Sequence, residues 1–276
     1  MKHLLLTAAA LAALGAGSAA NAQSARDWSG GYVGAQMGWG QRANAEGERL
    51  VFDTDLDGQF DDTVRTAAGA DAFSPGSCDG VARGAARGAG CTGDKDSNFE
   101  FGARAGYDWQ FGNWVVGGVA EVTRLNLDDD VTSFSTTPAF YTSTRELNGW
   151  GALRARGGYA MGDNLLYATA GVAWAEMRDR FTTSNGANSF TVTGDDKWVT
   201  GYQVGGGYER KLTDDVSLGV EYLYSNFDEG TATTRAGGPA PAGNPFLLVN
   251  SAGTDMRRSK DMTQIHSVRM TASYRF

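Results

Sequence analysis

The chain has 276 residues, 39 of them glycine and 5 proline, with a net charge of −8 and a pI near 4.8. Its mean hydropathy is −0.34, and after the first residues no stretch approaches the roughly 20 consecutive apolar residues of a spanning helix, which excludes a helical membrane protein. The acidic balance, without a basic stripe to contact phosphates, argues against a nucleic-acid partner.

The first residues have the pattern of a secretory signal peptide. Lys2 and His3 precede the apolar run "LLLTAAALAALGAGSAA", and the small residues "ANA" follow at 20–22. This order favours an export signal over a buried N-terminal helix. We expect residues 1–22 to be a signal peptide and residues 23–276 to form the mature domain.

The mature chain shows repeated period-2 alternation. In "NFEFGARAGYDWQF", Phe99 and Phe101 share one face while Glu100 and Arg104 share the other. Such alternation over about ten residues is typical of strands that cross a bilayer at a tilt. Eight segments are predicted as strands: 29–40, 97–110, 113–126, 145–160, 164–178, 196–210, 214–227 and 263–276.

The connections between these segments alternate in length. The links near 111–113, 161–163 and 211–213 are short turns, whereas 41–96, 127–144, 179–195 and 228–262 are long and polar. An up-and-down membrane barrel has this alternation, with short turns on the periplasmic side and long loops outside. We therefore predict an all-β fold, an eight-stranded antiparallel up-and-down transmembrane β-barrel with long extracellular loops.

The last strand, "IHSVRMTASYRF", has an apolar face that no later residue covers. Lipid would be the solvent of that face, and pairing of 263–276 with 29–40 would remove every sheet edge. Aromatic residues near the short-turn end predict an interfacial girdle. They are Trp28, Tyr107, Trp109, Trp114, Tyr159, Tyr208, Tyr274 and Phe276.

Together these segments resemble a known family, the small eight-stranded OmpA-like/opacity-type outer-membrane proteins, among them the porin-named surface proteins of alphaproteobacteria. The likeness lies in "WSGGYVGAQMGWG", "GALRARGGYA", "GYQVGGGYERKLTDDVSLGVEYLY" and the terminal "HSVRMTASYRF". The resemblance implies residence in the outer membrane of a Gram-negative bacterium, contact with outer-membrane lipid, and an assembly signal at Tyr274 and Phe276 read by the barrel-assembly machinery. The long first loop departs from the family.

Charged residues occupy the face that the barrel would turn inward. An eight-stranded barrel is only just wide enough for its own side chains, and buried charges there must pair. The pattern favours an ion-pair network that plugs the lumen, and a selective pore is the alternative. The expected inward residues are Glu100, Arg104, Asp108, Glu121, Arg154, Arg156, Gln203, Glu209, Glu221, Arg269 and Arg275.

The first long loop contains both cysteines and an acidic run. In an exported protein, Cys78 and Cys91 are expected to pair, with two free thiols as the alternative. The residues of "DTDLDGQFDD" follow the ligand spacing of a calcium loop, while Val64 replaces the bidentate Glu, so a solvated acidic loop is the other interpretation. The candidate calcium ligands are Asp53, Asp55, Asp57, Gln59 and Asp61.

No catalytic residues are predicted. Outside the signal segment the only histidine is His266, which the strand period turns towards lipid while Ser267 faces inward. We predict a structural or surface-interaction role with a side-chain-plugged lumen and an extracellular ligand as a further partner. A low-conductance channel for small solutes is the alternative, and a lipid-modifying enzyme is a third reading.

Overall fold

The computed structural model describes residues 27–43, 47–93, 97–194, 196–228 and 232–276. The predicted signal peptide, 1–22, lies outside these residues. Within the described ranges, no helix is long and apolar enough to cross a bilayer.

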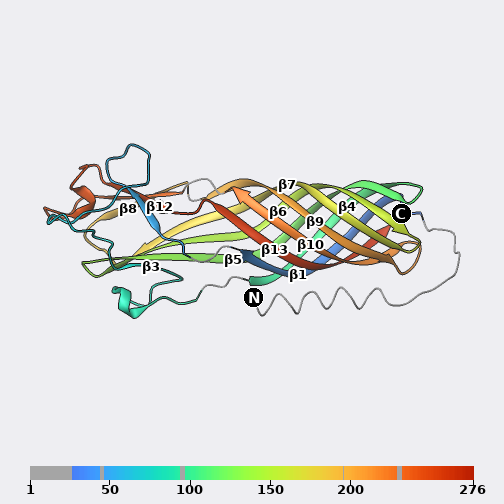
Figure 1. The fold of residues 1–276 in the computed structure, drawn as a ribbon, viewed down its shortest axis with the longest axis horizontal. Helices are drawn as coiled ribbons and strands as arrows, with labels where there is room; N and C mark the ends of the chain where they lie inside the picture. The colour runs from blue at the N-terminus through green and yellow to red at the C-terminus, as the bar shows by residue number, and fades with distance from the viewer. Residues whose placement is uncertain (1–26, 44–46, 94–96, 195, 229–231) are drawn as a thin grey trace.

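Eight antiparallel strands close into a ring in the order β5-β4-β1-β13-β10-β9-β7-β6, and β6 pairs back onto β5 (Figure 1). The fold class predicted from the alternation is confirmed. The strands are β1 (Gly30–Ala43), β4 (Ser97–Phe111), β5 (Trp114–Ser135), β6 (Ala139–Met161), β7 (Asn164–Thr183), β9 (Asp196–Lys211), β10 (Val216–Asp228) and β13 (Met262–Arg275).

The first and last strands of the ring pair along their whole length. Val33 lies opposite Tyr274, and Met37 opposite Met270. Beyond the last strand, the Phe276 N–H still donates to the Gly31 carbonyl at 2.9 Å. This pairing leaves no free edge in the part of the sheet that lipid surrounds, where an unpaired backbone group would cost several kcal/mol.

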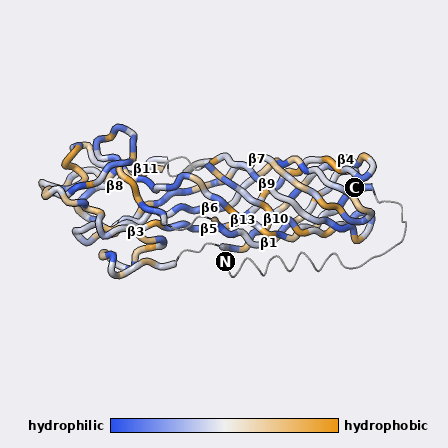
Figure 2. Tube along the Cα trace, viewed as in Figure 1, coloured by the Kyte–Doolittle hydropathy of each residue, from blue (hydrophilic) through white to orange (hydrophobic). Residues whose placement is uncertain are grey.

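The two faces of the ring have opposite chemistry, as the alternating colours along the barrel strands in Figure 2 show. On β13, outward Met270 is 61% exposed and Tyr274 53%, while Arg269, next to Met270, is 1% exposed. The apolar side chains therefore meet lipid and the charged ones fill the lumen.

Trp28 is an exception to the predicted girdle. It is fully buried, its indole N–H donates to the Gly162 carbonyl at 3.3 Å, and the Lys211 ammonium lies 5.2 Å from its ring centroid. The residue precedes β1, so the chain brings it across the short-turn mouth of the barrel and not along its outer wall. The girdle interpretation was wrong for this one tryptophan, which closes the mouth from inside.

Residues 127–144 were expected as a loop, and this was wrong. β5 continues to Ser135 and β6 starts again at Ala139, so the connection is 136–138. Strands of 22 and 23 residues exceed the roughly 9–11 that cross a bilayer. The alternation persists there with polar outward residues such as Asp128, which suits a wall that continues above the membrane.

Register shifts mark the level at which the outward residues of the wall change from apolar to polar. They lie between Arg124 and Leu127 on β5 and between Leu147 and Trp150 on β6. Gly149 sits in this bulge at φ +138°, and a Cβ there would meet the Thr123 carbonyl oxygen at 2.2 Å. Only glycine fits the bulge, which adds a bend where extra residues enter the pair.

The other predicted loops, 41–96, 179–195 and 228–262, build a second sheet. It has four antiparallel strands in the order β2-β12-β11-β8. Their bounds are β2 (Leu50–Asp53), β8 (Ser189–Thr193), β11 (Thr233–Gly237) and β12 (Thr254–Arg258). A further strand, β3 (Gly76–Asp79), pairs with the upper part of β5, and the short helices η1 (Arg87–Ala89) and η2 (Pro245–Leu247) complete this end.

We call this end of the molecule the headpiece: the second sheet, β3 and the upper parts of β5, β6 and β7 (Figure 1, left). It has its own apolar core between the second sheet and the wall. The core residues are Leu50, Phe52, Val64, Ala72, Ala139, Tyr141, Ala236, Phe246 and Met256, with Phe73, Phe181 and Phe190 packed against them. The long connections thus form one packed body.

The headpiece core predicts a selective defect. Met256 on β12 is 1% exposed, and truncation of a buried methionine to alanine costs about 2–5 kcal/mol. We expect Met256→Ala to expose the headpiece to limited proteolysis while the heat-modifiable gel shift of the barrel persists. Met262→Ala is the matched control, because that side chain is 55% exposed. Equal protease resistance of both variants would show that the headpiece does not depend on this core.

Candidate functional site

The lumen contains a compact ion-pair cluster at which two arginines and two glutamates converge. Arg154 Nη2 lies 2.5 Å from Glu121 Oε2 and 3.1 Å from Glu221 Oε1. Arg269 contacts the same two carboxylates at 2.9 and 2.6 Å. All four side chains are fully buried, so each charge is compensated only by the others.

Two further predicted residues, Arg104 and Glu100, extend this cluster. Arg104 Nη2 lies 3.4 Å from Glu221 Oε2, which also accepts a 2.8 Å hydrogen bond from the Tyr167 hydroxyl. Glu100 accepts a 2.8 Å hydrogen bond from the Ser267 hydroxyl. Because these residues come from β4, β7, β10 and β13, the cluster connects opposite walls of the barrel.

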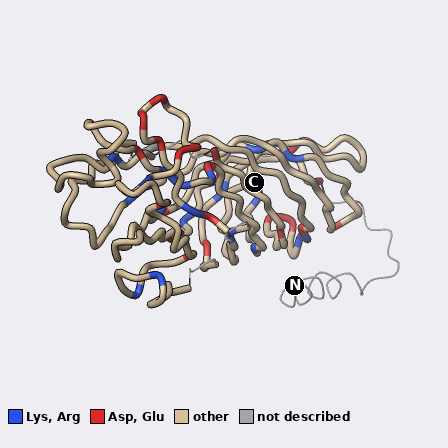
Figure 3. Tube along the Cα trace, turned by 60° about the vertical axis from the view of Figure 1, so that its left-hand side comes forward, with Lys and Arg blue, Asp and Glu red and all other residues tan. Residues whose placement is uncertain are grey.

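A second level lies closer to the short-turn end. Arg156 Nη2 contacts Glu209 Oε2 at 2.8 Å, and Glu209 also accepts a 2.6 Å hydrogen bond from the Ser217 hydroxyl. The Arg156 guanidinium stacks over Tyr167, 4.2 Å from the ring centroid. Below it, Arg275 Nη2 contacts Asp108 Oδ2 at 2.9 Å. The structure thus buries all eleven residues that the period turned inward, and basic and acidic positions lie side by side along the barrel in Figure 3.

An apolar layer lies beyond the ion pairs, towards the headpiece, and sequence reasoning missed it. Trp150 on β6 and Phe227 on β10 have ring centroids 6.0 Å apart, although β7 and β9 separate their strands in the ring. Their side chains therefore meet across the lumen. The layer consists of Leu125, Leu127, Leu147, Trp150, Ala152, Ala173, Ala175, Met177, Val199, Phe227 and Ile265.

The sequence carried a signal for this layer. On β5 the inward positions continue from Glu121 and Thr123 to Leu125 and Leu127. Outward positions become polar at the same height, with Arg124 and Asn126 exposed. An inversion of the alternation, apolar inside and polar outside, marks the place where lipid gives way to water on the outer face.

A further ionic layer, formed around Arg258, joins the apolar layer to the headpiece. Arg258 of β12 forms a bidentate pair with Glu48 at 2.7 and 2.8 Å and donates to the Asp129 carbonyl at 2.8 Å. Arg42 and Arg258 also pair with the Asp129 carboxylate. Burial raises the pKa of Glu48, but the hydrogen bond and charge of Arg258 outweigh it and hold that pKa below its ordinary value. Three segments far apart in the chain are thus fastened at one point.

In the structure, the acidic run brings together a different set of carboxylates from the calcium ligands that its spacing predicted. Oxygens of Asp53, Asp55 and Asp62 lie within 4.8 Å of one another, and Asp57 and Asp61 are not in this group. Gln59 donates its side-chain amide to Asp57 at 3.0 Å. Asp53 instead shapes the turn, since its carboxylate accepts from the N–H groups of Leu56 and Gly58. The segment is the blue loop that projects from the headpiece in Figure 1.

The charges of this group oppose one another. The Asp57 N–H lowers the pKa of Asp55, but burial and the negative charges of Asp57, Asp62 and Asp53 outweigh it, so the pKa lies above its ordinary value. The N–H and hydroxyl of Thr54 hold the pKa of Asp62 low. A hard cation would relieve the repulsion, and carboxylate oxygens are the ligands that Ca²⁺ takes.

The remaining predicted residues are separate from these clusters. Cys78 and Cys91 form a disulfide with a Cα–Cα distance of 6.2 Å. His266 faces outward, where Nδ1 contacts the Tyr222 hydroxyl at 2.5 Å, and the wall of the barrel separates it from Ser267. Phe276 is 75% exposed at the short-turn end.

Comparison with protein families gives one match over nearly the whole chain. The family described as "Outer membrane protein beta-barrel domain" matches residues 9–276. Several curated proteins match a smaller part of the chain, among them two outer-membrane proteins. The 31 kDa outer-membrane immunogenic protein of Brucella melitensis is 30% identical over 137 residues, 46% of this chain and 53% of that protein. The 22 kDa outer membrane protein of Rhizobium leguminosarum is 32% identical over 123 residues, 44% of this chain and 49% of that protein.

The chain thus spans about half the length of the curated relatives it matches. Among solved structures, the outer membrane protein OprG from Pseudomonas aeruginosa is similar with a TM-score of 0.43 and 13% identity. The similarity covers 90% of this chain and 97% of that one.

The shared carboxylates predict a large effect of removing one arginine. Arg154→Ala would leave Glu121 and Glu221 with less compensating charge in a site without water contact, and we expect a loss of about 3–5 kcal/mol in unfolding free energy. Arg124→Ala is the matched control, because Arg124 is exposed on the outer face of β5. Urea unfolding in detergent micelles, followed by the heat-modifiable gel shift, measures both. Equal midpoints for the two variants would contradict the network's contribution to stability.

The acidic group predicts a response to calcium removal. With Ca²⁺ bound by Asp53, Asp55 and Asp62, we expect slower proteolysis of the segment 53–62 than in EDTA, with weak affinity on the order of 10⁻⁴–10⁻³ M as in extracellular modules. The measurement is limited proteolysis across a calcium titration. Asp55→Asn/Asp62→Asn should cancel the protection, and Asp128→Asn, a change on the outer face of β5, should not. Identical cleavage in both buffers would leave a solvated acidic loop.

Proposed function

Because the chain belongs to the outer membrane protein β-barrel family, we propose that its barrel is an anchor closed to solutes that holds the headpiece at the cell surface. The protein is an outer-membrane protein of a Gram-negative bacterium, as its relatives are. In this role the barrel contributes position and rigidity, and the headpiece makes the contacts.

The layered filling of the lumen is the observation that carries the proposal. Charged side chains at two levels, the apolar layer and the ionic layer of Arg258 follow one another along the axis. An ion on this path would first have to break buried pairs and then enter a layer of Leu, Trp and Phe side chains without polar partners. Both steps are costly, because a charge separated from its partners in a low-dielectric interior is strongly destabilised.

The headpiece supports the surface role. Ordering roughly 90 residues of connection costs about 1–2 kcal/mol of backbone entropy per residue, far more than closing a barrel requires. The chain offsets this cost with a separate core, a second sheet and a disulfide. Long ordered loops of this kind usually serve binding, so we assign the interaction with an extracellular partner to this end.

The proposal assigns no catalytic activity to the protein. His266 shares a hydrogen bond with Tyr222 on the outer face, a pairing that suits an interfacial aromatic cluster. We assign Tyr274 and Phe276 to recognition by the barrel-assembly machinery, since both are exposed at the end of the closing strand.

Conductance separates the anchor from the channel for small solutes. We expect wild-type protein to give no steady unitary conductance in planar lipid bilayers, because the apolar layer excludes ions. The double variant Trp150→Ala/Phe227→Ala removes the rings that meet across the lumen and should allow brief openings, while Trp198→Ala, which removes a ring that is 70% exposed, should remain silent. Steady conductance from folded wild-type protein would contradict the anchor and favour the channel.

A further inference from the structure

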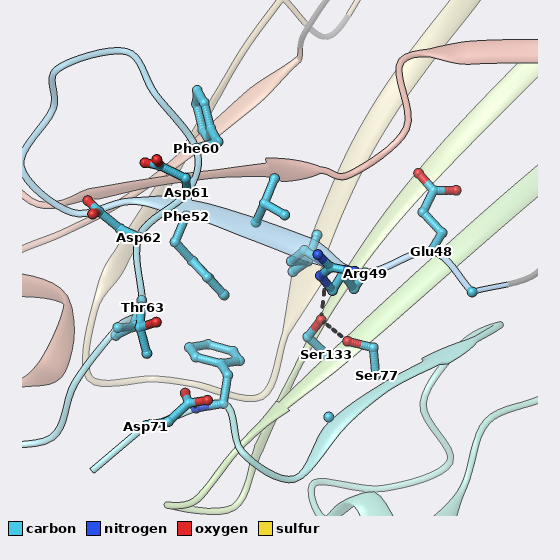
Figure 4. Close-up of a pocket in the computed structure, with 16 residues that line it drawn as sticks. Glu48, Arg49, Phe52, Phe60, Asp61, Asp62, Thr63, Asp71, Ser77 and Ser133 are labelled. Atoms are coloured by element: carbon cyan, nitrogen blue, oxygen red, sulfur yellow. Dashed lines mark hydrogen bonds between the residues drawn. The ribbon is translucent and has the colours of Figure 1, made fainter. Parts of the chain in front are cut away.

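The headpiece contains a hollow of about 520 Å³ between β2, β3 and the segment 60–73 (Figure 4). This volume lies within the roughly 300–1,000 Å³ of small-molecule sites. The edge of β2 is already occupied there, because Phe52 forms a β-bridge with Asp62 and the Leu50 N–H donates to Ser133 Oγ at 3.3 Å. A ligand in the hollow would therefore be recognised by side chains and not by pairing with a strand.

The floor of the hollow is apolar. Phe52 and Val64 are buried beneath it, and the ring of Phe73 packs against Phe52 with a centroid distance of 4.4 Å. Phe60 is partly exposed and lines the same hollow. Aromatic and aliphatic side chains form most of the lining of typical ligand sites, so the part of a ligand that covers this floor should be apolar.

One side of the hollow offers negative charge. Asp62 is already engaged, since its Oδ2 accepts from the N–H and the hydroxyl of Thr54 at 2.7 and 2.8 Å. Asp71 uses Oδ1 to accept from the Phe73 N–H at 2.8 Å, which leaves Oδ2 available. Asp61 is exposed, and among the described residues its carboxylate has no hydrogen bond or ion pair. Asp61 and Asp71 can therefore accept from a cationic group of a ligand.

The opposite side offers hydrogen-bond donors. Figure 4 shows Arg49, Ser77 and Ser133 away from the aspartates. The Arg49 guanidinium is exposed and has no partner among the described residues. Ser77 Oγ and Ser133 Oγ lie 2.7 Å apart, and Ser133 Oγ also accepts from the Leu50 N–H.

The serine pair has one hydrogen more than it uses. Two hydroxyls carry two hydrogens, and only one of these lies in the bond between Ser77 and Ser133. In the part of the chain that the structure describes, no acceptor is within reach of the second hydrogen. Whichever serine holds it, this hydrogen adds to the Arg49 guanidinium as a donor for an anionic group.

We propose that the hollow binds a small zwitterion, with an ammonium group at one end, a carboxylate at the other and an apolar body between them. This is the chemistry of a short peptide with free termini. The ammonium lies at Asp61 and Asp71, the carboxylate accepts from Arg49 and from the spare serine hydroxyl, and the body covers Phe52 and Phe73. The inference rests on the surface role proposed above and names the class of ligand that the headpiece takes.

A zwitterion matches these groups better than a simple ion does. A cation alone would leave the Arg49 guanidinium and the spare hydroxyl hydrogen without an acceptor, and an anion alone would be repelled by Asp61 and Asp71. Arg65, which bridges to Asp71 through the backbone, donates to the Gly69 carbonyl at 3.1 Å and does not line the hollow. The two aspartates thus keep their charge for a ligand.

The test uses full-length protein in detergent micelles, with EDTA to keep calcium from the neighbouring acidic group. The probe is the tripeptide Ala-Val-Ala with free termini, titrated by calorimetry. Two capped forms serve as comparisons: N-acetylation removes the ammonium, and C-amidation removes the carboxylate. The site variants are Asp61→Asn/Asp71→Asn and Arg49→Gln. Matched controls are Asp128→Asn and Arg124→Gln on the outer face of β5, and the heat-modifiable gel shift verifies that each variant is folded.

We expect saturable binding of the free tripeptide and about tenfold weaker binding when either end is capped, because each cap removes a charged hydrogen bond. The effect of acetylation should vanish in Asp61→Asn/Asp71→Asn, and the effect of amidation should vanish in Arg49→Gln. The controls on β5 should bind as the wild type does. This pattern of coupling assigns each end of the ligand to one side of the hollow.

Three results would overturn the proposal. Absence of saturable binding would show that the hollow does not take such a ligand. Equal binding of the amidated peptide would show attraction of a cation by the aspartates alone. Equal losses in the site variants and in the controls on β5 would place the peptide elsewhere on the protein or in the micelle.

The outcome is independent of the anchor role. Failure of the tripeptide to bind leaves the silent barrel as proposed, since bilayer recordings do not involve the hollow. A conducting wild-type barrel would overturn the anchor, and binding in the hollow would then stand without it.

Discussion

Closure of the ring between β1 and β13 is the interaction on which the rest of the structure depends. Hydrocarbon offers no hydrogen-bond partner, so the first strand must find the last, some 230 residues later. Once the ring is closed with eight strands, its diameter is fixed, and the lumen is only wide enough for side chains. Everything placed inside must then be compensated inside.

The interior meets this requirement differently at different heights. Where lipid surrounds the wall, the lumen holds arginines and glutamates that share partners, such as Arg269 between Glu121 and Glu221. Where the outer face turns polar, the interior turns apolar, and Trp150 and Phe227 meet across it. The wall therefore keeps one apolar face along its length. This face is the outer one in the membrane and becomes the inner one above the bulge near Gly149. In the proposed anchor role, the same residues that stabilise the barrel also close it to ions.

The sequence predicted the barrel well because period-2 alternation reports directly on which face meets lipid. The inward phase of Glu100, Arg154 and Arg269 could be read from neighbouring residues alone. Prediction from the sequence failed where the local pattern of residues does not determine the position of a side chain. Trp28 has the composition of a girdle residue, but its position before β1 sends it into the lumen. Glu48 and Arg258 lie in polar connections without a period, and their pairing depends on the packing of distant segments. The acidic group likewise took Asp62 in place of Asp57 and Asp61, because the turn around Asp53 used the intervening residues.

The strand order of the second sheet has a consequence for assembly. β2 comes from the first long connection, yet its sheet partner β12 comes from the last, as does β11, and β8 comes from the connection between β7 and β9. No single segment can form this surface in advance, and no part of it can be completed before the final hairpin is in place. A partner or an antibody that recognises the assembled headpiece therefore recognises only chains whose barrel is finished. The presence of the assembled headpiece at the cell surface therefore reports that the barrel has folded correctly in the membrane.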